Sequence, residues 1–191
     1  MRLKILNPGR LFVITVFAVI TSVASYGQGI VPGNVEVTGH LGLVSGIGSH
    51  GSFGGSVGTP ITDHMILSGD LSYIPMGGSS VSINGATASS SAKAFNFNGN
   101  LQYQFKASRA VIPYAGAGLG FLHSSFNSTS NLGGTGPFVV QGSSTDMYFN
   151  MGGGLRYFVN ERWGFRPELM IFAGSNTYVR LAGGVFYKFG E

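Results

Sequence analysis

Seven charged residues stand at polar positions of stretches in which apolar and polar residues alternate, and their types suit ion pairing. Carboxylates and guanidinium or ammonium groups on one face of neighbouring strands attract each other and share hydrogen bonds. We therefore predict an ionic network that packs the interior of the fold and has a structural role. Its members are Glu36, Asp70, Arg156, Arg166, Glu168, Arg180 and Lys188.

The order of the segments predicts two pairings within this network. Arg156 and Glu168 lie on either side of a short polar turn, so Glu168 is expected to reach Arg156 directly or diagonally. Lys188, near the end of the chain, approaches Glu36, near its start, if the first and last strands meet. The alternative to a packed interior is an open, water-filled one, because Gly, Ser and Asn residues on the same face as these charges leave room for water.

Hydrolytic chemistry has two weak candidates. The sequence GGSVG around Ser56 matches the G-x-S-x-G pattern, but a nucleophile elbow needs a strand, a turn and a helix, and the following TPITDH supplies no helix. His123 beside Ser124 and Ser125 would suit hydrolysis of lipid acyl chains if a third group oriented the imidazole. We predict a protein without catalytic residues, and a lipid-modifying enzyme is the less favoured alternative.

The sequence predicts neither a metal site nor a cofactor. The histidines His40, His50, His64 and His123 are scattered, without the spacing of metal ligands. The stretch GAGLG, residues 116–120, lacks the spacing and the following helix of a nucleotide-binding fingerprint. Its glycines are expected to face bulky side chains in the interior.

The elements that must position these residues are β-strands, and AFNFNGNLQYQF, Ala94–Phe105, is the clearest of them. Apolar residues and amides alternate there without a fault, and a period of two places them on opposite faces of a strand. A soluble barrel would turn the aromatic rings inward, whereas a membrane barrel would turn them to lipid and the amides to its lumen. At a tilt near 45° such a strand spans roughly 28 Å, close to the apolar band of outer-membrane barrels.

The same alternation recurs along the chain, interrupted by clusters of Gly, Ser, Asn and Pro. No stretch after residue 27 shows convincing helical periodicity. We predict eight strands, over residues 34–45, 51–59, 65–74, 94–105, 112–123, 146–158, 164–173 and 178–189.

The predicted connections differ in length. Those after the second, fourth and sixth strands are short, whereas Pro75–Lys93 and Ser124–Thr145, after the third and fifth, are predicted to be long polar loops. Outer-membrane barrels combine short periplasmic turns with longer extracellular loops. Residues for adhesion or recognition would lie in these loops, although the loop sequences do not indicate a particular partner.

The first 27 residues are expected to be a cleaved secretory signal peptide, and residues 28–191 one barrel domain. Three basic residues precede the apolar run Leu11–Ala24, and the small residues of Ser25–Gly27 follow it. The apolar run is short for a membrane-spanning helix of about 20 residues. An uncleaved anchor is the alternative.

The composition favours a surface that meets lipid. Charged residues make up 9% of the chain, against about a quarter in ordinary soluble domains, and Gly accounts for 32 of 191 residues. Without the signal, eight basic and seven acidic residues remain, so no nucleic-acid partner is expected. The chain has no cysteine, so its stability must come without disulfides.

The distribution of charge decides which face meets lipid. Charges within the strands share a face with the amides, and a basic residue on the lipid face would cost about 2–4 kcal/mol at mid-bilayer. Aromatic residues collect toward the two ends of the strands, as expected for rings at headgroup level. Near the short turns we expect Tyr103, Phe105, Tyr114, Tyr157, Trp163, Phe165, Tyr187 and Phe189, and near the long loops Tyr73, Phe95, Phe121, Phe149 and Tyr178.

Two segments resemble a known family. GGGLRYFVNERWGFRPELMIF, Gly152–Phe172, resembles the sixth strand, turn and seventh strand of small outer-membrane β-barrels of the OmpA or opacity-like type. VRLAGGVFYKF, Val179–Phe189, is similar to their closing strand, which implies that Tyr187 and Phe189 are read by the outer-membrane assembly machinery. Two further residues follow Phe189, and the peptidoglycan binding of larger relatives is not carried over.

We therefore predict an all-β protein, an exported, eight-stranded, antiparallel up-and-down transmembrane β-barrel of the bacterial outer membrane with a structural or surface role. Outer-membrane lipid and the assembly machinery are its expected partners, and we expect a monomer without a cofactor. The alternatives are a small pore or ligand-binding barrel, a lipid-modifying enzyme, and a soluble barrel of the lipocalin kind. The last would require Phe95, Phe97, Leu101 and Tyr103 to point inward.

Overall fold

The computed structural model describes residues 35–46, 48–83, 86–105, 110–132 and 135–190, so the predicted signal peptide lies outside the described residues. Within these ranges there is no helix long and apolar enough to cross a membrane. The strands are β1 (Val35–Ser45), β2 (His50–Pro60), β3 (Met65–Ile83), β4 (Ala86–Gln104), β5 (Val111–Leu132), β6 (Thr135–Phe158), β7 (Trp163–Gly174) and β8 (Thr177–Phe189).

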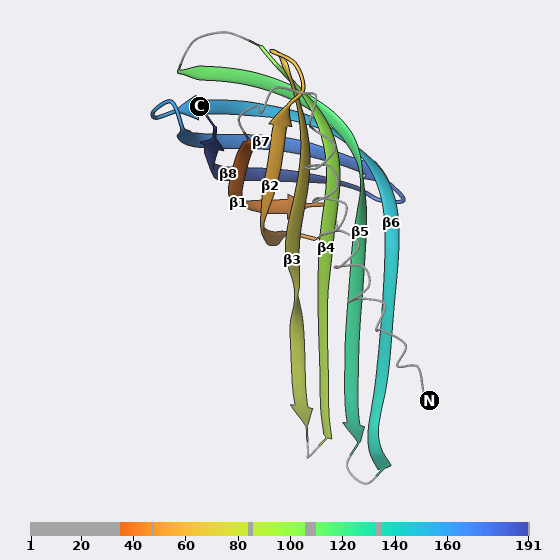
Figure 1. Cartoon of the computed structure of the whole chain (residues 1–191). Helices are drawn as coiled ribbons and strands as arrows, with labels where there is room; N and C mark the ends of the chain where they lie inside the picture. Colours follow the sequence, from red (N-terminus) through yellow and green to blue (C-terminus); the bar gives the residue numbers. More distant parts are fainter. Residues whose placement is uncertain (1–34, 47, 84–85, 106–109, 133–134, 191) are drawn as a thin grey trace, which may run out of the picture. The chain divides into compact units, whose positions relative to one another are not determined.

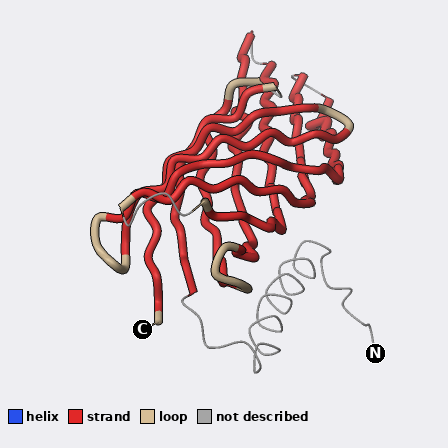
Figure 2. The backbone as a smooth tube through the Cα atoms, turned by 90° about the horizontal axis from the view of Figure 1, so that it is seen from above, coloured by secondary structure: helices blue, strands red, loops and turns tan. Residues whose placement is uncertain are grey.

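The eight strands form one closed sheet. Each strand pairs antiparallel with the next in the chain, and β8 pairs with β1 from Val35 opposite Phe189 to Ser45 opposite Val179. The strands twist strongly as the sheet curls round to close (Figures 1 and 2). Within its closed part the sheet has none of the free edges that an open sheet would present. The predicted eight-stranded, up-and-down barrel is confirmed.

The two long connections are not loops, and this part of the prediction is wrong. β3 and β4 stay paired as far as Ile83 opposite Ala86, and β5 and β6 as far as Leu132 opposite Thr135. These residues are rich in Ser, Thr and Asn, which lack the alternating hydrophobicity that marks a strand in the sequence. The four strands therefore extend well past the other four, as Figure 1 shows.

Side-chain orientation follows the alternation of the sequence. In β4, Phe95, Leu101 and Tyr103 keep 41–47% of their surface exposed on the outside, whereas Asn98 and Gln102 inside are at most 3% exposed. A soluble barrel of the lipocalin kind requires the opposite orientation. The outward surface is the one that a lipid solvent selects, and the interior is polar.

Aromatic residues form belts toward both ends of the outward surface. Ring pairs such as Trp163 with Phe165 and Tyr187 with Phe189 gather at the short-turn end, with centroids 5.8 and 4.7 Å apart. At the other end, the Tyr73 ring lies 5.0 Å from that of Phe95. The prediction is wrong for two members of the belts, Tyr114 and Tyr178. Their side chains point into the lumen and are at most 4% exposed.

Candidate functional site

Acids and arginines alternate in a chain of contacts across the barrel interior. Arg180 donates from Nη1 to Asp70 Oδ1 at 2.9 Å and from Nη2 to Glu168 Oε1 at 3.0 Å. Arg166 donates from Nη2 to Glu168 Oε2 at 2.7 Å and from Nη1 to Glu36 Oε1 at 3.5 Å. Because β3, β8, β7 and β1 each contribute a member, the network ties together strands that are far apart in the sequence.

Arg156 on β6 ends this chain of contacts. Its Nε lies 3.1 Å from both carboxylate oxygens of Glu36, and its Nη2 donates to Gln102 Oε1 at 2.6 Å. The structure thus pairs Arg156 with Glu36 across the lumen and not with Glu168, the partner expected from the short turn. Gly154 lies opposite Glu168, which leaves Arg156 as a diagonal neighbour of Glu168, but its guanidinium extends across the lumen to Glu36 instead.

Lys188 stands at the margin of the network. It lies opposite Glu36 in the register of β8 and β1, as strand closure predicts. Its Nζ, however, lies 4.5 Å from the centroid of the Phe158 ring, and no ion pair joins it to a described residue. Glu36 is already held by two arginines, so it has little to offer a third cation.

Two further residues belong to the network but were not among the predicted members. The hydroxyl of Tyr114 donates to Glu168 Oε2 at 2.6 Å and accepts from Arg166 Nε at 2.8 Å. His40 Nε2 lies 2.8 Å from Asp70 Oδ2. Position in the strand is the signal that finds both, since the alternation of β1 and β5 puts them on the inward face, although Tyr114 was expected in the aromatic belt.

The ionic side chains are deeply buried and balanced in charge. Three arginines face three carboxylates, and each of these six side chains is at most 9% exposed. Charges held away from water are stable only when paired and hydrogen-bonded. Each of the six is paired with an opposite charge, although Arg156 Nη1 and Arg180 Nε have no hydrogen-bond partner among the described residues. An arrangement of this kind can hold strands together across a lumen.

Glycine makes room for the large inward side chains. A Cβ placed on Gly154 would stand 2.8 Å from Tyr114 Oη, and one on Gly120 would stand 2.6 Å from Tyr148 Oη. Both contacts are closer than a real Cβ tolerates. Gly120 belongs to the GAGLG stretch, whose small residues therefore accommodate lumen contents.

Tyr114 offers a direct measure of how much the hydroxyl bridge contributes. Replacing Tyr114 by Phe removes one hydrogen bond to Glu168 and one from Arg166, both to charged groups, and we expect the free energy of unfolding to fall by about 1–3 kcal/mol. Urea unfolding in phospholipid vesicles measures it. Tyr103→Phe on the exposed outward face is the control and should change less than about 0.5 kcal/mol. Equal effects would contradict a bracing role for Tyr114.

Above the ionic network, toward the long hairpins, the lumen becomes apolar. Phe172 stacks on Tyr178 with centroids 4.5 Å apart, and Tyr148 meets Phe172 edge-on at 5.2 Å. Tyr148 also bonds to Asn96 and Asn98, which continue the polar interior. The plug of buried residues comprises Val44, Ile74, Ala94, Leu122, Tyr148, Met170, Phe172 and Tyr178. These side chains fill the outer part of the lumen.

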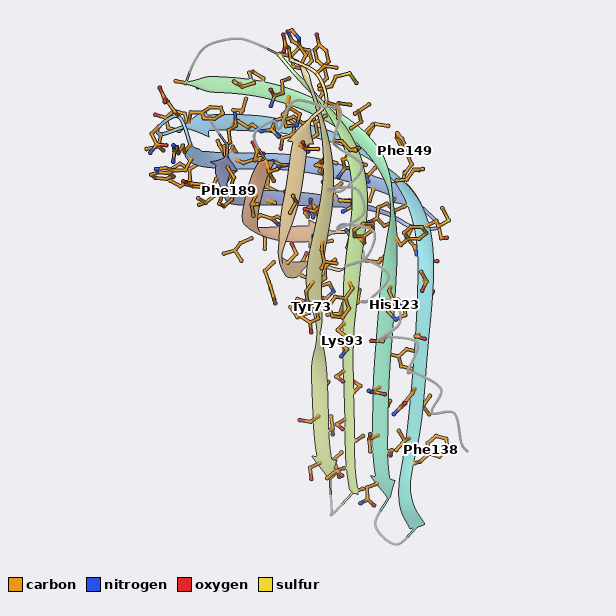
Figure 3. The ribbon with its side chains drawn as sticks, viewed as in Figure 1. Tyr73, Lys93, His123, Phe138, Phe149 and Phe189 are labelled. Atoms are coloured by element: carbon orange, nitrogen blue, oxygen red, sulfur yellow. The ribbon has the colours of Figure 1, made fainter. Side chains whose placement is uncertain are left out.

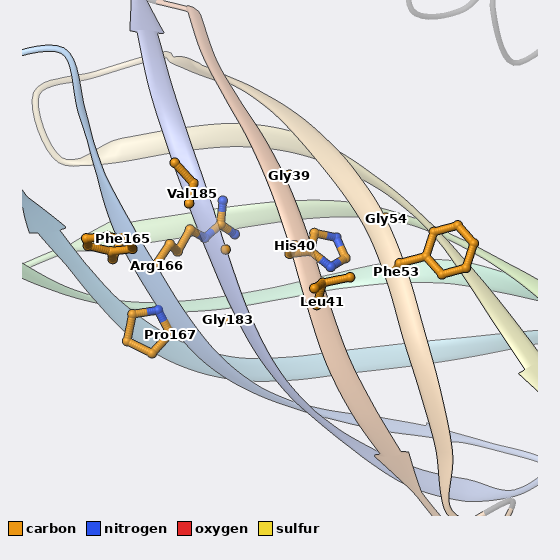
Figure 4. Close-up of a pocket in the computed structure, with 11 residues that line it drawn as sticks. Gly39, His40, Leu41, Phe53, Gly54, Phe165, Arg166, Pro167, Gly183 and Val185 are labelled. Carbon is orange, nitrogen blue, oxygen red and sulfur yellow. The ribbon is translucent and has the colours of Figure 1, made fainter.

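A groove of about 760 Å³ lies on the outside of the wall formed by β1, β2, β7 and β8 (Figure 4). Leu41, Phe53 and Phe165 line it, and no atom lies within 4 Å of where a Cβ would stand on Gly39 or Gly183. Glycines thin the wall at this place, so His40 and Arg166 of the lumen network also contribute to the lining.

The hydrolytic candidates do not assemble into a catalytic site. Ser56 is buried in the lumen, where it accepts a hydrogen bond from Arg166 at 3.3 Å. His123 Nδ1 lies 2.8 Å from Thr145 Oγ1, and Ser124 points to the opposite face of the strand. Within the described part of the chain, no group of three or more His, Asp or Glu side chains could hold a metal ion.

Comparison with known sequences agrees with this geometry. The outer membrane protein beta-barrel domain family matches residues 12–189 of the chain. No curated protein matches it.

Solved structures with the same fold are small barrels. The N-terminal β-barrel domain of OprF from Pseudomonas aeruginosa is 22% identical, with a TM-score of 0.54 over 82% of this chain and 98% of that one. Neisserial surface protein A, NspA, is 18% identical, with a TM-score of 0.56 over 82% and 96%. Ail, the attachment invasion locus protein of Yersinia pestis, is 12% identical, with a TM-score of 0.55 over 82% and 97%.

Proposed function

Since the chain belongs to the outer membrane protein beta-barrel domain family, we propose that this outer-membrane barrel serves as a recognition protein at the cell surface. Its long hairpins hold the binding surface, and its lumen holds the brace that keeps the barrel rigid. The partner is a protein that offers an extended segment. Catalysis is no part of the role.

The observation that carries this proposal is the four-stranded sheet that β3, β4, β5 and β6 form beyond the aromatic belt. From Phe95 at the belt to the end of β4 at Ala86, the strand rises by about 30 Å. β7 ends at Gly174, opposite Tyr148, so the residues of β6 before Tyr148 have a partner strand on one side alone. An edge of this kind presents free backbone donors and acceptors to which a strand of another protein can add.

The sequence of this edge leaves it open to pairing. Between Phe138 and Met147 there is one charged residue, Asp146, and no proline, whereas protected edges carry lysine, proline or a bulge. The opposite edge, on β3, is interrupted by a register shift between Pro75 and Gly78. The β6 edge is therefore the better docking strand.

The extended sheet also offers apolar contacts. Its lumen-side face carries large hydrophobic residues that are 41–68% exposed, whereas the outward face is mostly hydroxyls and amides, with Val139 and Lys93 as exceptions. The apolar residues are Val81, Ile83, Phe126, Phe138 and Val140. Contiguous exposed apolar residues on a protein in water favour a protein-binding role. Ail, which shares the fold, is described as an attachment protein.

Three properties of the barrel accompany this proposal. Residues 1–27 act as the cleaved signal for export. The closing strand, with Tyr187 and Phe189 exposed on the outward face, is read by the assembly machinery. The barrel stands alone in lipid, as a monomer with no nucleic-acid partner. The filled lumen favours this role over a small pore, and the separation of His123 from Ser124 disfavours an acyl hydrolase.

Two matched lysine variants test the docking strand. Val140→Lys puts a charge on the β6 edge, and Val81→Lys puts the same charge on the same face at the β3 edge. Cells carrying equal surface amounts of each variant are tested for attachment to immobilised fibronectin, laminin and collagen. We expect Val140→Lys to lower attachment about tenfold, since a charge on the edge opposes strand addition, whereas Val81→Lys keeps it.

Each other outcome has a meaning. Loss of attachment with both variants would assign recognition to the apolar lumen-side face of the extended sheet instead of the β6 edge. Full attachment by both variants, or no attachment by the wild-type cells, would contradict recognition of these proteins by the hairpins.

A further inference from the structure

One lysine and one histidine, Lys93 and His123, lie outside the lumen network on the outward face of the sheet. Lys93 on β4 is exposed and forms no ion pair with any described residue. In the register of β4 and β5, Lys93 lies opposite Ser125 and Phe95 lies opposite His123. Lys93 and His123 are therefore diagonal neighbours, roughly 7–8 Å apart along the sheet.

Both side chains stand just past the outer aromatic belt. Tyr73, Phe95 and Phe121 are the last outward aromatic rings of their strands before the polar extension begins. Figure 3 shows Lys93 and His123 beside Tyr73, at the root of the long hairpins. Because such belts sit at headgroup level, the two side chains lie where the phosphates of the outer leaflet lie.

The electrostatic surroundings suit an anion. Within the described residues, no acid lies on the outward face of β3, β4, β5 or β6. The nearest candidate, Asp146, shares the lumen-side face with Tyr148 and accepts a hydrogen bond from Ser144. Lys93 is also the single lysine or arginine on the outward face of the described strands, so its charge is uncompensated.

Hydrogen-bond donors lie on the β5 side of Lys93. His123 Nδ1 lies 2.8 Å from Thr145 Oγ1. In the tautomer in which the Thr145 hydroxyl donates to Nδ1, His123 carries its proton on Nε2 and can donate it to a ligand. Ser125 and Ser143, opposite each other on β5 and β6, add two hydroxyls to the same face.

We propose that Lys93 and His123, with the hydroxyl of Ser125, bind the phosphate of an anionic lipid in the outer leaflet. The site fixes the height of the barrel in the membrane at the root of the hairpins. It depends on the outer-membrane location but not on what the hairpins recognise.

Lipid retention by the folded, detergent-solubilised full chain tests the proposal. The probes are lipid A with two phosphates and the dephosphorylated form with the same acyl chains, counted as adducts by native mass spectrometry. We expect the wild type to retain the phosphorylated form in preference. Lys93→Gln should weaken retention about fivefold, the effect of one basic side chain at an anionic membrane surface, and adding His123→Gln should weaken it further. Boiling-dependent gel mobility confirms that each variant is folded.

Arg162→Gln is the control, because Arg162 is an exposed cation in the turn between β6 and β7, at the other end of the barrel. Its retention should equal that of the wild type. Equal retention of the two lipids, or a folded Lys93→Gln variant that binds like the wild type, would overturn the proposal. Equal losses in Lys93→Gln and Arg162→Gln would replace it by general attraction, and displacement by inorganic phosphate would assign the site to a free anion. Loss of retention with cell attachment intact would separate this site from the hairpin function.

Discussion

Replacing Glu168 by Gln is expected to lower the free energy of unfolding by about 3–5 kcal/mol, the usual loss when one partner is removed from a buried ion pair. Glu168 is at the centre of the network, where it accepts from Arg166, Arg180 and Tyr114 at 2.6–3.0 Å. Glutamine has nearly the same shape, so the packing is kept and the negative charge is lost.

The loss is large because the arginines remain. With Glu168 replaced by a neutral side chain, three buried guanidinium groups share the two carboxylates of Glu36 and Asp70, which leaves one positive charge without a counterion. The amide of the introduced glutamine would also direct its NH₂ group toward one of the groups that now donate to Glu168, and two donors would then face each other. Neither arginine can lose its proton to relieve the imbalance, since guanidinium groups stay charged in proteins.

Urea unfolding in phospholipid vesicles measures the effect, with fluorescence of Trp163, the single tryptophan, as one readout and gel mobility as the other. Glu161→Gln removes the same charge from an exposed turn and should change stability by less than about 0.5 kcal/mol. If both variants unfold at the same urea concentration with equal slopes, the lumen network does not brace the barrel.

The sequence predicts the membrane-embedded part of this fold well because lipid enforces a simple pattern there. In β4, each outward residue of that part is apolar and each inward residue is an amide, so strand position and orientation follow together. The same rule places Glu36, Asp70 and Arg180 inside. It also places Tyr114 and Tyr178 inside, which shows that position in the strand outweighs the preference of aromatic rings for the membrane interface.

The partners within the lumen and the length of the hairpins do not follow from the sequence in this way. Arg156 reaches across the barrel to Glu36, a choice that depends on barrel diameter and on the register of non-adjacent strands. Beyond the membrane the strands are in water, and no lipid requires one face to be apolar. The sequence of Ser79–Ser82 therefore resembles that of a loop, although the segment forms part of β3. Pairing with β4, visible only in three dimensions, makes it a strand.

An arginine introduced at Leu119 is expected to destabilise the barrel by about 2–4 kcal/mol, whereas one introduced at Asn127 should have almost no effect. Both residues lie on the outward face of β5, eight positions apart, and the Leu119 side chain is 60% exposed. Leu119 lies opposite Gly99, in the middle of the apolar band, whereas Asn127 lies opposite Ser91 in the extended sheet. The two substitutions therefore share a strand and an orientation and differ in depth.

Vesicle-based unfolding of the pair reports where the membrane ends. If the boundary lies at Lys93 and His123, arginine at Phe121 should have an intermediate cost, and arginine at Ser125 should resemble arginine at Asn127. A cost at Asn127 as large as that at Leu119 would place the extended sheet within the bilayer. The exposed β6 edge would then lie in lipid, where free backbone donors and acceptors are not tolerated. Recognition of a partner by strand addition at this edge would therefore be ruled out. A steep fall in cost between residues 119 and 125 would instead leave about 30 Å of paired strands in water, available to another protein.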